Sequence, residues 1–221
     1  LEVPNDVIST FSLNRITGVP TSTGFSLPVS EPDPVRIAPH PSGEFVYVAH
    51  SGAVVTSYTA TPEGQLSNNA ASPPIATELG GSLPIFNATG DVMYKVNPES
   101  DSITIFQVDL VTGELSYLDP TTPHFQVATG DRPSAALLSR DGELLYVANA
   151  GSASISAYNV GPTGDLTLAS STSASANINS LFLYPNTTIP ALYALSDAGV
   201  ISGFTTNVDG TLTSINSTRG P

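Results

Sequence analysis

The sequence contains no cysteine and a single lysine, Lys95, among its 221 residues. Without cysteine the chain has no disulfide, no thiolate nucleophile and no cysteine-ligated metal. Basic residues number 6 against 19 acidic ones, which gives a net charge of −13. Nucleic acids and anionic membrane surfaces both bind through clustered lysine and arginine, so we expect neither as a partner.

Long apolar runs are also missing. No stretch reaches the ~18 apolar residues of a membrane span, so we expect no membrane insertion. The first ten residues, LEVPNDVIST, lack the basic start and apolar centre of a signal peptide. A leader was therefore either never present or has been removed. Charged residues make up only 11 % of the chain, so uncharged polar residues must supply much of its surface polarity.

Three sites match the Asn-x-Ser/Thr pattern of N-glycosylation, namely Asn87, Asn186 and Asn216. A chain with a single lysine is unusual for a cytosolic protein, and the absence of cysteine is compatible with secretion. These features favour an extracellular or cell-surface location and make the three asparagines candidate glycan sites.

Two short phrases recur along the chain with the same spacing. A glycine followed shortly by leucine occurs in PEGQLS, VTGELS, PTGDLT and VDGTLT; with a looser ITGVPT near the start, the glycines lie 46–51 residues apart. An apolar run centred on tyrosine occurs in FVYVAH, VMYKVN, LLYVAN and ALYALS, with the tyrosines 47–52 residues apart. Two independent phrases that keep one period indicate an internal repeat.

Each period contains four short strands separated by turns rich in glycine and proline. In the third unit we expect the strands at 133–139, 144–149, 154–160 and 166–172. The second of these is apolar throughout, as in a strand covered on both faces. Four-stranded antiparallel units at a period of about 40–50 residues are typical of a β-propeller, whose blades bury one another's faces around an axis. The sequence therefore predicts an all-β propeller.

The repeat predicts one domain, 1–221, with four complete blades and a half blade. The complete blades span about 34–72, 82–126, 132–172 and 178–216, and the half blade, 6–24, matches only the third and fourth strands. Because the half blade lacks two inner strands, we expect the chain to be part of a larger ring, of about seven blades. Further chain or a second polypeptide would complete the ring. A five-bladed ring completed from elsewhere is the smaller alternative.

The third unit resembles a known family. RPSAALLSRDGELLYVANAGSASISAYNV (132–160) is similar to the signature blade of the seven-bladed lactonase propellers, which include bacterial 6-phosphogluconolactonase and fungal carboxy-muconate cyclase. PHPSGEFVYVAHSGAVVTSY (39–58) and DSITIFQVDLVTGELSYL (101–118) are similar in the same way. The resemblance covers nearly the whole chain and implies a propeller of YVTN-type repeats.

Several charged positions that the resemblance implies for the central site are replaced here. The family's Arg-Pro is present as Arg132-Pro133, but its Asn-Arg-Gly is Asn149-Ala150-Gly151. Its Gly-Pro-Arg-His corresponds to Gly80-Gly81-Ser82-Leu83, and its Asn-Glu to Asn97-Pro98. Opening or closing a lactone needs proton-transfer groups and cations that hold a carboxylate or phosphate. The replacements therefore argue against lactone chemistry in the family's manner.

The remaining ligand candidates are Arg36 and Arg132, because each lies at or just before an innermost strand and can face the central channel. Asp131 is adjacent to Arg132, so a local ion pair is the alternative role for both. His40 follows an innermost strand, where a turn role is the alternative, and His50 is interpreted as structural. No metal-ligand pattern is present, and we expect neither metal nor cofactor.

Two functions fit these observations. The first is a non-catalytic extracellular propeller that serves as a binding or assembly module, with a protein partner or second chain adding strands to an open sheet edge. The second is a lactonase or lactonising cyclase acting on a small acidic sugar lactone or a muconate-type substrate, with Arg36, Arg132 and His40 in the channel. The fold alone does not separate them, because propellers host many functions.

Overall fold

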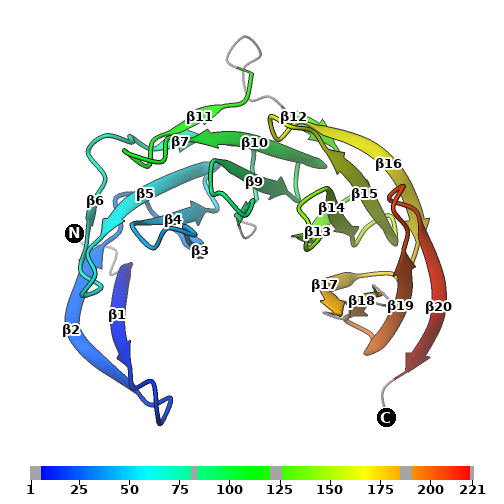
Figure 1. The fold of residues 1–221 in the computed structure, drawn as a ribbon, viewed down its shortest axis with the longest axis horizontal. Helices are drawn as coiled ribbons and strands as arrows, with labels where there is room; N and C mark the ends of the chain where they lie inside the picture. The colour runs from blue at the N-terminus through cyan, green and yellow to red at the C-terminus, as the bar shows by residue number, and fades with distance from the viewer. Residues whose placement is uncertain (1–5, 81–83, 120–125, 185–190, 220–221) are drawn as a thin grey trace.

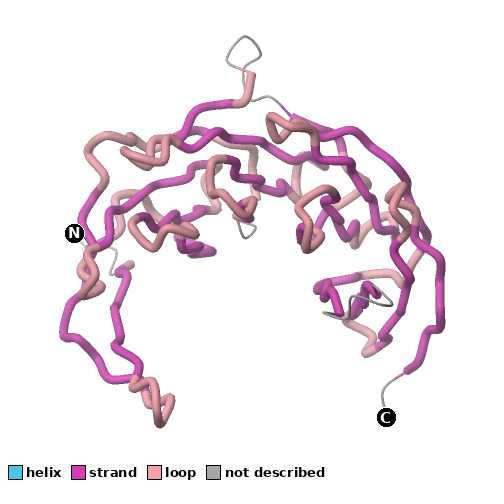
Figure 2. Tube along the Cα trace, in the orientation of Figure 1, coloured by secondary structure: helices cyan, strands magenta, loops and turns pink. Residues whose placement is uncertain are grey.

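The computed structural model describes residues 6–80, 84–119, 126–184 and 191–219, the last four by their backbone alone (Figure 1). Throughout these ranges the secondary structure is strand, turn and loop, without any helix (Figure 2). No segment there forms a helix that is long and apolar enough to cross a membrane. The predicted all-β class is confirmed.

The strands form one hairpin and four antiparallel sheets. The hairpin, the half blade, consists of β1 (Val7–Leu13) and β2 (Pro20–Pro28). Blade 1 contains β3 (Pro34–Pro39), β4 (Phe45–His50), β5 (Val54–Ala60), β6 (Leu66–Asn68) and β7 (Ile75–Ala76); blade 2 contains β8 (Ile85–Phe86), β9 (Val92–Asn97), β10 (Ser102–Val108), β11 (Leu115–Tyr117) and β12 (Gln126–Ala128). Blade 3 contains β13 (Pro133–Leu138), β14 (Leu144–Asn149), β15 (Ser154–Val160) and β16 (Leu166–Ser173); blade 4 contains β17 (Ile178–Tyr184), β18 (Ala191–Ser196), β19 (Val200–Thr206) and β20 (Leu212–Arg219).

Blades 1 and 2 have a divided outermost strand. In blade 1, β6 and β7 both pair with β5, and in blade 2, β11 and β12 both pair with β10. The half blade extends to Pro28, four residues beyond its expected end at 24, with Val7 opposite Pro28. Phe25 and Leu27 explain why β2 continues beyond residue 24, because they are half-buried at alternate positions of the strand.

The blades follow one another around an open arc (Figure 1). The first strands, β3, β13 and β17, lie on the inner side of the arc, and the fourth strands, such as β16 and β20, lie on the outer side. The half blade and blade 4 stand at the two ends of the arc. Each blade therefore presents a face to its neighbour, which is the arrangement of a propeller.

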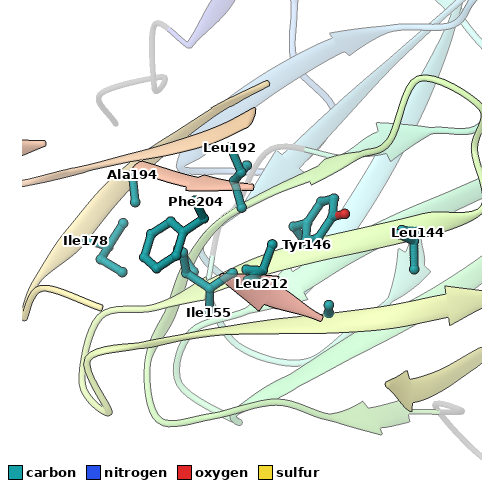
Figure 3. Packing of buried hydrophobic residues seen from close by; sticks show 10 residues of the cluster. Leu144, Tyr146, Ile155, Ile178, Leu192, Ala194, Phe204 and Leu212 are labelled. Carbon is teal, nitrogen blue, oxygen red and sulfur yellow. The ribbon is translucent and has the colours of Figure 1, made fainter. Parts of the chain in front are cut away.

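Three apolar clusters fill the spaces between successive blades. Phe45 and Tyr47 of blade 1 pack with Met93 and Phe106 of blade 2, and the opposite face of blade 2 packs on blade 3. The third cluster joins blades 3 and 4, where Phe204 lies among apolar side chains from both sheets (Figure 3). A lone sheet would leave these faces in water, so the blades hold together chiefly by apolar burial.

The two recurring sequence phrases touch each other across these interfaces. The Tyr47 hydroxyl donates to the Gly113 carbonyl over 2.8 Å, and the Tyr94 hydroxyl donates to the Gly164 carbonyl over 3.0 Å. Each bond joins the second strand of one blade to the turn between the third and fourth strands of the next. Gly113 has φ of +69°, and a Cβ there would overlap the Phe45 ring. Both the turn and the close approach therefore require glycine.

Candidate functional site

One end of the blades carries a repeated set of strained residues. Asp33, Arg132 and Asn177 each come directly before a first strand, and their φ angles are 53°, 50° and 54°. Ala53, Asp101 and Ala153 lie between the second and third strands, with φ of 62°, 50° and 48°. Because neighbouring strands are antiparallel, these two kinds of turn lie at the same end of each blade. Left-handed backbone is costly for non-glycine residues and is often found at functional sites, so this end is the candidate site.

Aspartate side chains link one blade to the next at this end. Asp101 Oδ1 accepts a hydrogen bond from the Arg132 backbone N–H over 2.7 Å. Asp6 precedes β1 as Asp101 precedes β10, and its Oδ2 accepts from the Asp33 N–H over 3.3 Å. The same connection therefore joins the half blade to blade 1 and blade 2 to blade 3.

The backbone N–H groups of residues 130, 131 and 132 each donate a hydrogen bond to a side-chain oxygen. Gly130 N–H donates to Asn149 Oδ1 over 3.2 Å, and Asp131 N–H donates to Ser152 Oγ over 2.9 Å. The Arg132 carbonyl accepts from the Ala150 N–H over 2.9 Å. The left-handed conformation of Arg132 is therefore determined by contacts from two blades, and its side chain projects from a rigid base.

Within the described part of the chain, the Arg132 side chain is exposed and forms neither an ion pair nor a hydrogen bond. The local pair with Asp131, which the sequence offered as its alternative role, is not formed. Instead, the Asp131 carboxylate lies against Gly151, where a Cβ would overlap it. The guanidinium is free to bind a carboxylate or phosphate through two parallel hydrogen bonds.

Arg36 lies elsewhere, on β3 between the half blade and blade 1. Its guanidinium donates to the Val35 carbonyl over 2.9 Å, and the side chain is exposed. It lines a cavity of about 290 Å³ whose other walls are mostly apolar. No contact among the residues described here joins Arg36 to Arg132.

The two described histidines are buried and fully hydrogen-bonded. His40 lies between blades 1 and 2, with Nε2 2.9 Å from the Gly90 carbonyl and Nδ1 2.9 Å from Ser42 Oγ. Its ring meets Phe86 edge-on at 5.2 Å. His50 bridges the Pro32 carbonyl and Thr56 Oγ1, each over 2.9 Å. Both rings are positioned to join segments of the fold, and neither has a nitrogen left for a substrate.

Lys95 is a buried cation that sequence reasoning did not place in the site. Its Nζ donates to the carbonyls of Glu78 and Gly80, over 3.2 and 2.8 Å, and to Asn97 Oδ1 over 2.7 Å. Burial lowers the pKa of this ammonium to about 8, against the opposing attraction of Glu78. All three donor directions are used within the protein, so Lys95 anchors the chain entering blade 2. The signal in the sequence was a lysine in the run VMYKVN, where other blades have FVYVAH and LLYVAN.

The Glu78 carboxylate continues this network across blade 2. Glu78 Oε1 accepts from Gln126 Nε2 over 2.6 Å, and Oε2 accepts from Ser100 Oγ over 3.4 Å. The Asn97 side-chain nitrogen extends the network by donating hydrogen bonds to the hydroxyls of Ser102 and Thr104. The buried charge is therefore surrounded by paired polar groups, as stable burial requires.

The remaining predicted positions divide between described and undescribed residues. Asn87 is half-buried, and its amide nitrogen, the atom a glycan would join, donates to Asp91 Oδ1 over 2.7 Å. Asn216 lies in β20 opposite Gly203. Asn186, His124 and the stretch 81–83 lie outside the described residues. Among the residues that are described, no three His, Cys, Asp or Glu side chains come together to hold a metal ion.

Solved structures with the same arrangement are known. A candidate 6-phosphogluconolactonase from Bacteroides fragilis superimposes with a TM-score of 0.79 at 19 % identity, covering 96 % of this chain and 65 % of that one. A protein from Lactobacillus plantarum superimposes with a TM-score of 0.75 at 22 % identity, covering 95 % of this chain and 64 % of that one. The periplasmic gluconolactonase of Pseudomonas aeruginosa superimposes with a TM-score of 0.72 at 19 % identity, covering 96 % of this chain and 63 % of that one.

These likenesses establish the propeller fold, and the chain spans just under two thirds of the length of those structures. No curated protein matches the sequence. Residues 36–178 match the family described as lactonase, 7-bladed beta-propeller. This match covers well over half of the chain and includes blades 1 to 3 with the rigid Arg132 turn. The chain therefore belongs to the seven-bladed β-propeller lactonase family.

Proposed function

We propose that this propeller hydrolyses a small sugar lactone that carries an anionic substituent, bound at the end of the blades where Arg132 projects. Membership of the lactonase family supports lactone chemistry better than the non-catalytic module that the replaced positions suggested. The observation that carries the proposal is the exposed guanidinium of Arg132, which has no partner among the described residues and stands on a backbone held from two blades. Such a group binds phosphate or carboxylate without first giving up an internal partner.

The same end of blade 3 supplies one candidate for proton transfer. Lactone hydrolysis needs a base that orients water and a cation or donor that stabilises the developing oxyanion. His40 and His50 are committed to internal hydrogen bonds, so neither serves as that base. The Asp131 carboxylate lies beside Arg132 in the same turn and is exposed. In this proposal Arg132 binds the anionic substituent and Asp131 orients the water.

The test compares a phosphorylated with an uncharged lactone. Hydrolysis of 6-phosphogluconolactone and of gluconolactone is followed by acid release and corrected for the spontaneous rate. Arg132→Ala should lower kcat/KM for the phosphorylated lactone about 10²-fold, as expected for loss of a charge-assisted pair, and leave the uncharged lactone almost unchanged. Arg140→Ala is the matched control, because Arg140 is an exposed arginine in the turn at the other end of β13. Equal losses on both lactones would contradict the role given to Arg132.

Binding without turnover is the second candidate, and the commitment of both described histidines favours it. This function corresponds to an extracellular binding module in which Arg132 holds an anionic ligand. A wild-type protein that binds 6-phosphogluconate in calorimetry, but leaves both lactones at their spontaneous rates, would support this candidate and contradict hydrolysis. Loss of that binding in Arg132→Ala would place it at the same turn.

A further inference from the structure

The turn that enters blade 4 repeats the backbone of the Arg132 turn. Asn177 has φ of 54°, and Arg132 has φ of 50°. The residue that follows each of them, Ile178 or Pro133, is buried and pairs with the last residue of the second strand, after which a bulge shifts the register. Ile178 belongs to the apolar cluster between blades 3 and 4 (Figure 3). Asn177 therefore occupies in blade 4 the position that Arg132 occupies in blade 3.

Hydrogen bonds hold these two turns next to each other. The Ala150 N–H donates to the Arg132 carbonyl over 2.9 Å, and the Ala150 carbonyl accepts from the Asn177 N–H over 3.1 Å. The Ser134 hydroxyl, two residues after Arg132, also donates to the Ile178 carbonyl. Because the N and O atoms of one residue lie within about 4 Å of each other, the Arg132 carbonyl oxygen and the Asn177 nitrogen lie within about 10 Å.

The blade 4 turn is fixed through backbone groups. In blade 2, Asp101 accepts from the Arg132 N–H through its side chain. Ala153 stands at the corresponding place in blade 3 and has no side-chain acceptor, so the Asn177 N–H bonds a backbone carbonyl instead. The Asn177 carbonyl accepts from the Asp197 N–H over 3.1 Å. The position of Asn177 is therefore determined without the use of its side chain.

The Asn177 side chain is exposed, and its amide has no hydrogen-bond partner among the described residues. An amide offers two N–H donors and an oxygen acceptor, which match the donor and acceptor of a hydroxyl group. Because it is uncharged, it does not compete with an anion for the Arg132 guanidinium. Blade 1 has Asp33 at this position, whose carboxylate would compete in that way. Asparagine also adopts left-handed backbone more readily than most residues, so a purely conformational role is the alternative.

We propose that Arg132 and Asn177 form one ligand site across the boundary of blades 3 and 4, in which Asn177 binds a hydroxyl group of the sugar whose anionic substituent Arg132 binds. Asn177 then distinguishes a polyhydroxylated anion from one that lacks hydroxyl groups. A six-carbon chain with a phosphate at one end is long enough to contact both side chains. This inference rests on the anion site of the proposed function and adds to it the residue that selects a sugar.

The test compares two phosphates that differ only in their hydroxyl groups. Calorimetry at low ionic strength measures the affinity of glucitol 6-phosphate and of n-hexyl phosphate, which keeps the six-carbon chain and the phosphate. Arg132→Ala should weaken the binding of both ligands, because both lose the charge-assisted pair. Asn177→Gly should weaken glucitol 6-phosphate roughly fivefold, as expected for the loss of one hydrogen bond, and change n-hexyl phosphate less than twofold.

Glycine is the informative substitution because it adopts φ of 54° without strain and keeps the backbone of the turn. A purely conformational role of Asn177 therefore predicts no change in either affinity. Asn159→Ala is the matched control, because it removes an exposed amide near the opposite end of β15 and should leave both affinities unchanged.

Asn177→Asp tests the neighbourhood of the two side chains. Aspartate keeps the shape of asparagine and tolerates the same backbone, but it adds a negative charge close to Arg132. Both phosphates should therefore bind several-fold more weakly. Unchanged affinity for both would show that Asn177 is too far from the bound anion to share its site, and would overturn the inference.

The outcomes separate this inference from the proposed function. If Asn177→Gly weakened both phosphates equally, or neither, the role given to Asn177 would be wrong, whereas that of Arg132 would stand. If Arg132→Ala left both affinities unchanged, the anion site itself would be wrong, and both proposals would be lost. A wild-type protein that binds neither phosphate would have the same consequence.

Discussion

The ammonium of Lys95 donates to the side-chain oxygen of Asn97, two residues along the same strand, over 2.7 Å. The Glu78 carboxylate, which attracts the ammonium, accepts its hydrogen bonds from Gln126 and Ser100. The charge is therefore stabilised by dipoles in a buried position where blades 1 and 3 have valine and blade 4 has alanine. Burial lowers the pKa of the ammonium to about 8, from an ordinary value of 10.5.

This shift predicts that stability rises with pH above about 8. Between pH 8 and 10.5 the unfolded chain keeps the Lys95 proton that the folded protein has released, so the unfolded state binds more protons. The contribution over the full window is on the order of 3 kcal/mol. Above pH 10 the buried hydroxyls of Tyr47 and Tyr94 act in the opposite direction, because burial raises their pKa above the ordinary value of 10.0.

Urea unfolding at pH 7.5, 8.5 and 9.5 checks this dependence. The free energy of unfolding of the wild type should increase across the series, and that of Lys95→Met should stay nearly level. Lys95→Met should also lose about 1–3 kcal/mol at pH 9.5, because the Gly80 carbonyl and the Asn97 side-chain oxygen lose the donor that Lys95 supplies. A wild-type profile that falls between pH 7.5 and 9.5 would contradict the assigned shift.

The tyrosine bonds between blades should contribute measurably to stability. Tyr47→Phe removes the donor to Gly113 while keeping the ring, and leaves the buried Gly113 carbonyl without that partner. We expect a loss of about 1–2 kcal/mol in the free energy of unfolding. Tyr193→Phe is the control at the equivalent position of blade 4, where the ring is 37 % exposed. Its effect should lie within about 0.5 kcal/mol, and equal effects of the two changes would argue against the interblade bond.

Alanine substitutions at two turn glycines should distinguish the cost of backbone strain from the cost of disturbed packing between blades. Gly142→Ala introduces a side chain at φ of +77° with nothing within 4 Å, so only strain applies, at about 1 kcal/mol. Gly113→Ala has the same strain, and its methyl group also overlaps Phe45. We expect it to lose about 2–4 kcal/mol in total, because the packed interface must deform. Thermal unfolding of the two variants side by side measures the difference, and similar Tm values would contradict it.

Asp101 should strengthen ligand binding by holding the backbone of Arg132 in place. Asp101→Ala removes the acceptor that holds the Arg132 N–H, so the guanidinium loses part of its fixed position. The KM for the phosphorylated lactone should rise several-fold with little change in kcat, and exchange of the Arg132 amide should quicken. Asp101→Asn keeps an oxygen acceptor and tolerates the left-handed backbone, so it should restore both properties. If Asn and Ala behaved alike, the hydrogen bond would not be what positions Arg132.

Much of the fold was predictable because its information is local. The apolar run 144–149 was expected as a covered strand and is β14, and the strand expected at 154–160 is β15. The alternation of side chains and the turn preference of glycine are properties of a few consecutive residues. The divided outer strands of blades 1 and 2 were not predicted, because polar outer strands lack the apolar pattern that marks the inner ones.

The candidate site was predicted less well, because it depends on contacts between blades. Arg132 was identified from its place before an innermost strand, but its hydrogen bond to Asp101 joins residues 31 positions apart. Lys95 was visible in VMYKVN, yet nothing in that run indicates that its partners are the carbonyls of Glu78 and Gly80. Similarly, His40 was a channel candidate from its position after an innermost strand, but its ring bonds to the carbonyl of Gly90, a residue 50 positions further along the chain.

The sequence by itself determined the period, the strands and the glycine and tyrosine positions of each blade, because short-range pattern and turn conformation specify them. Only the tertiary structure decided that Tyr47 meets Gly113 in the next blade, that Lys95 is buried, and that the Arg132 guanidinium has no partner within the described ranges. These outcomes depend on how one sheet is rotated and translated against the next. That relation arises from the packing of two whole faces, and no single stretch of the chain encodes it.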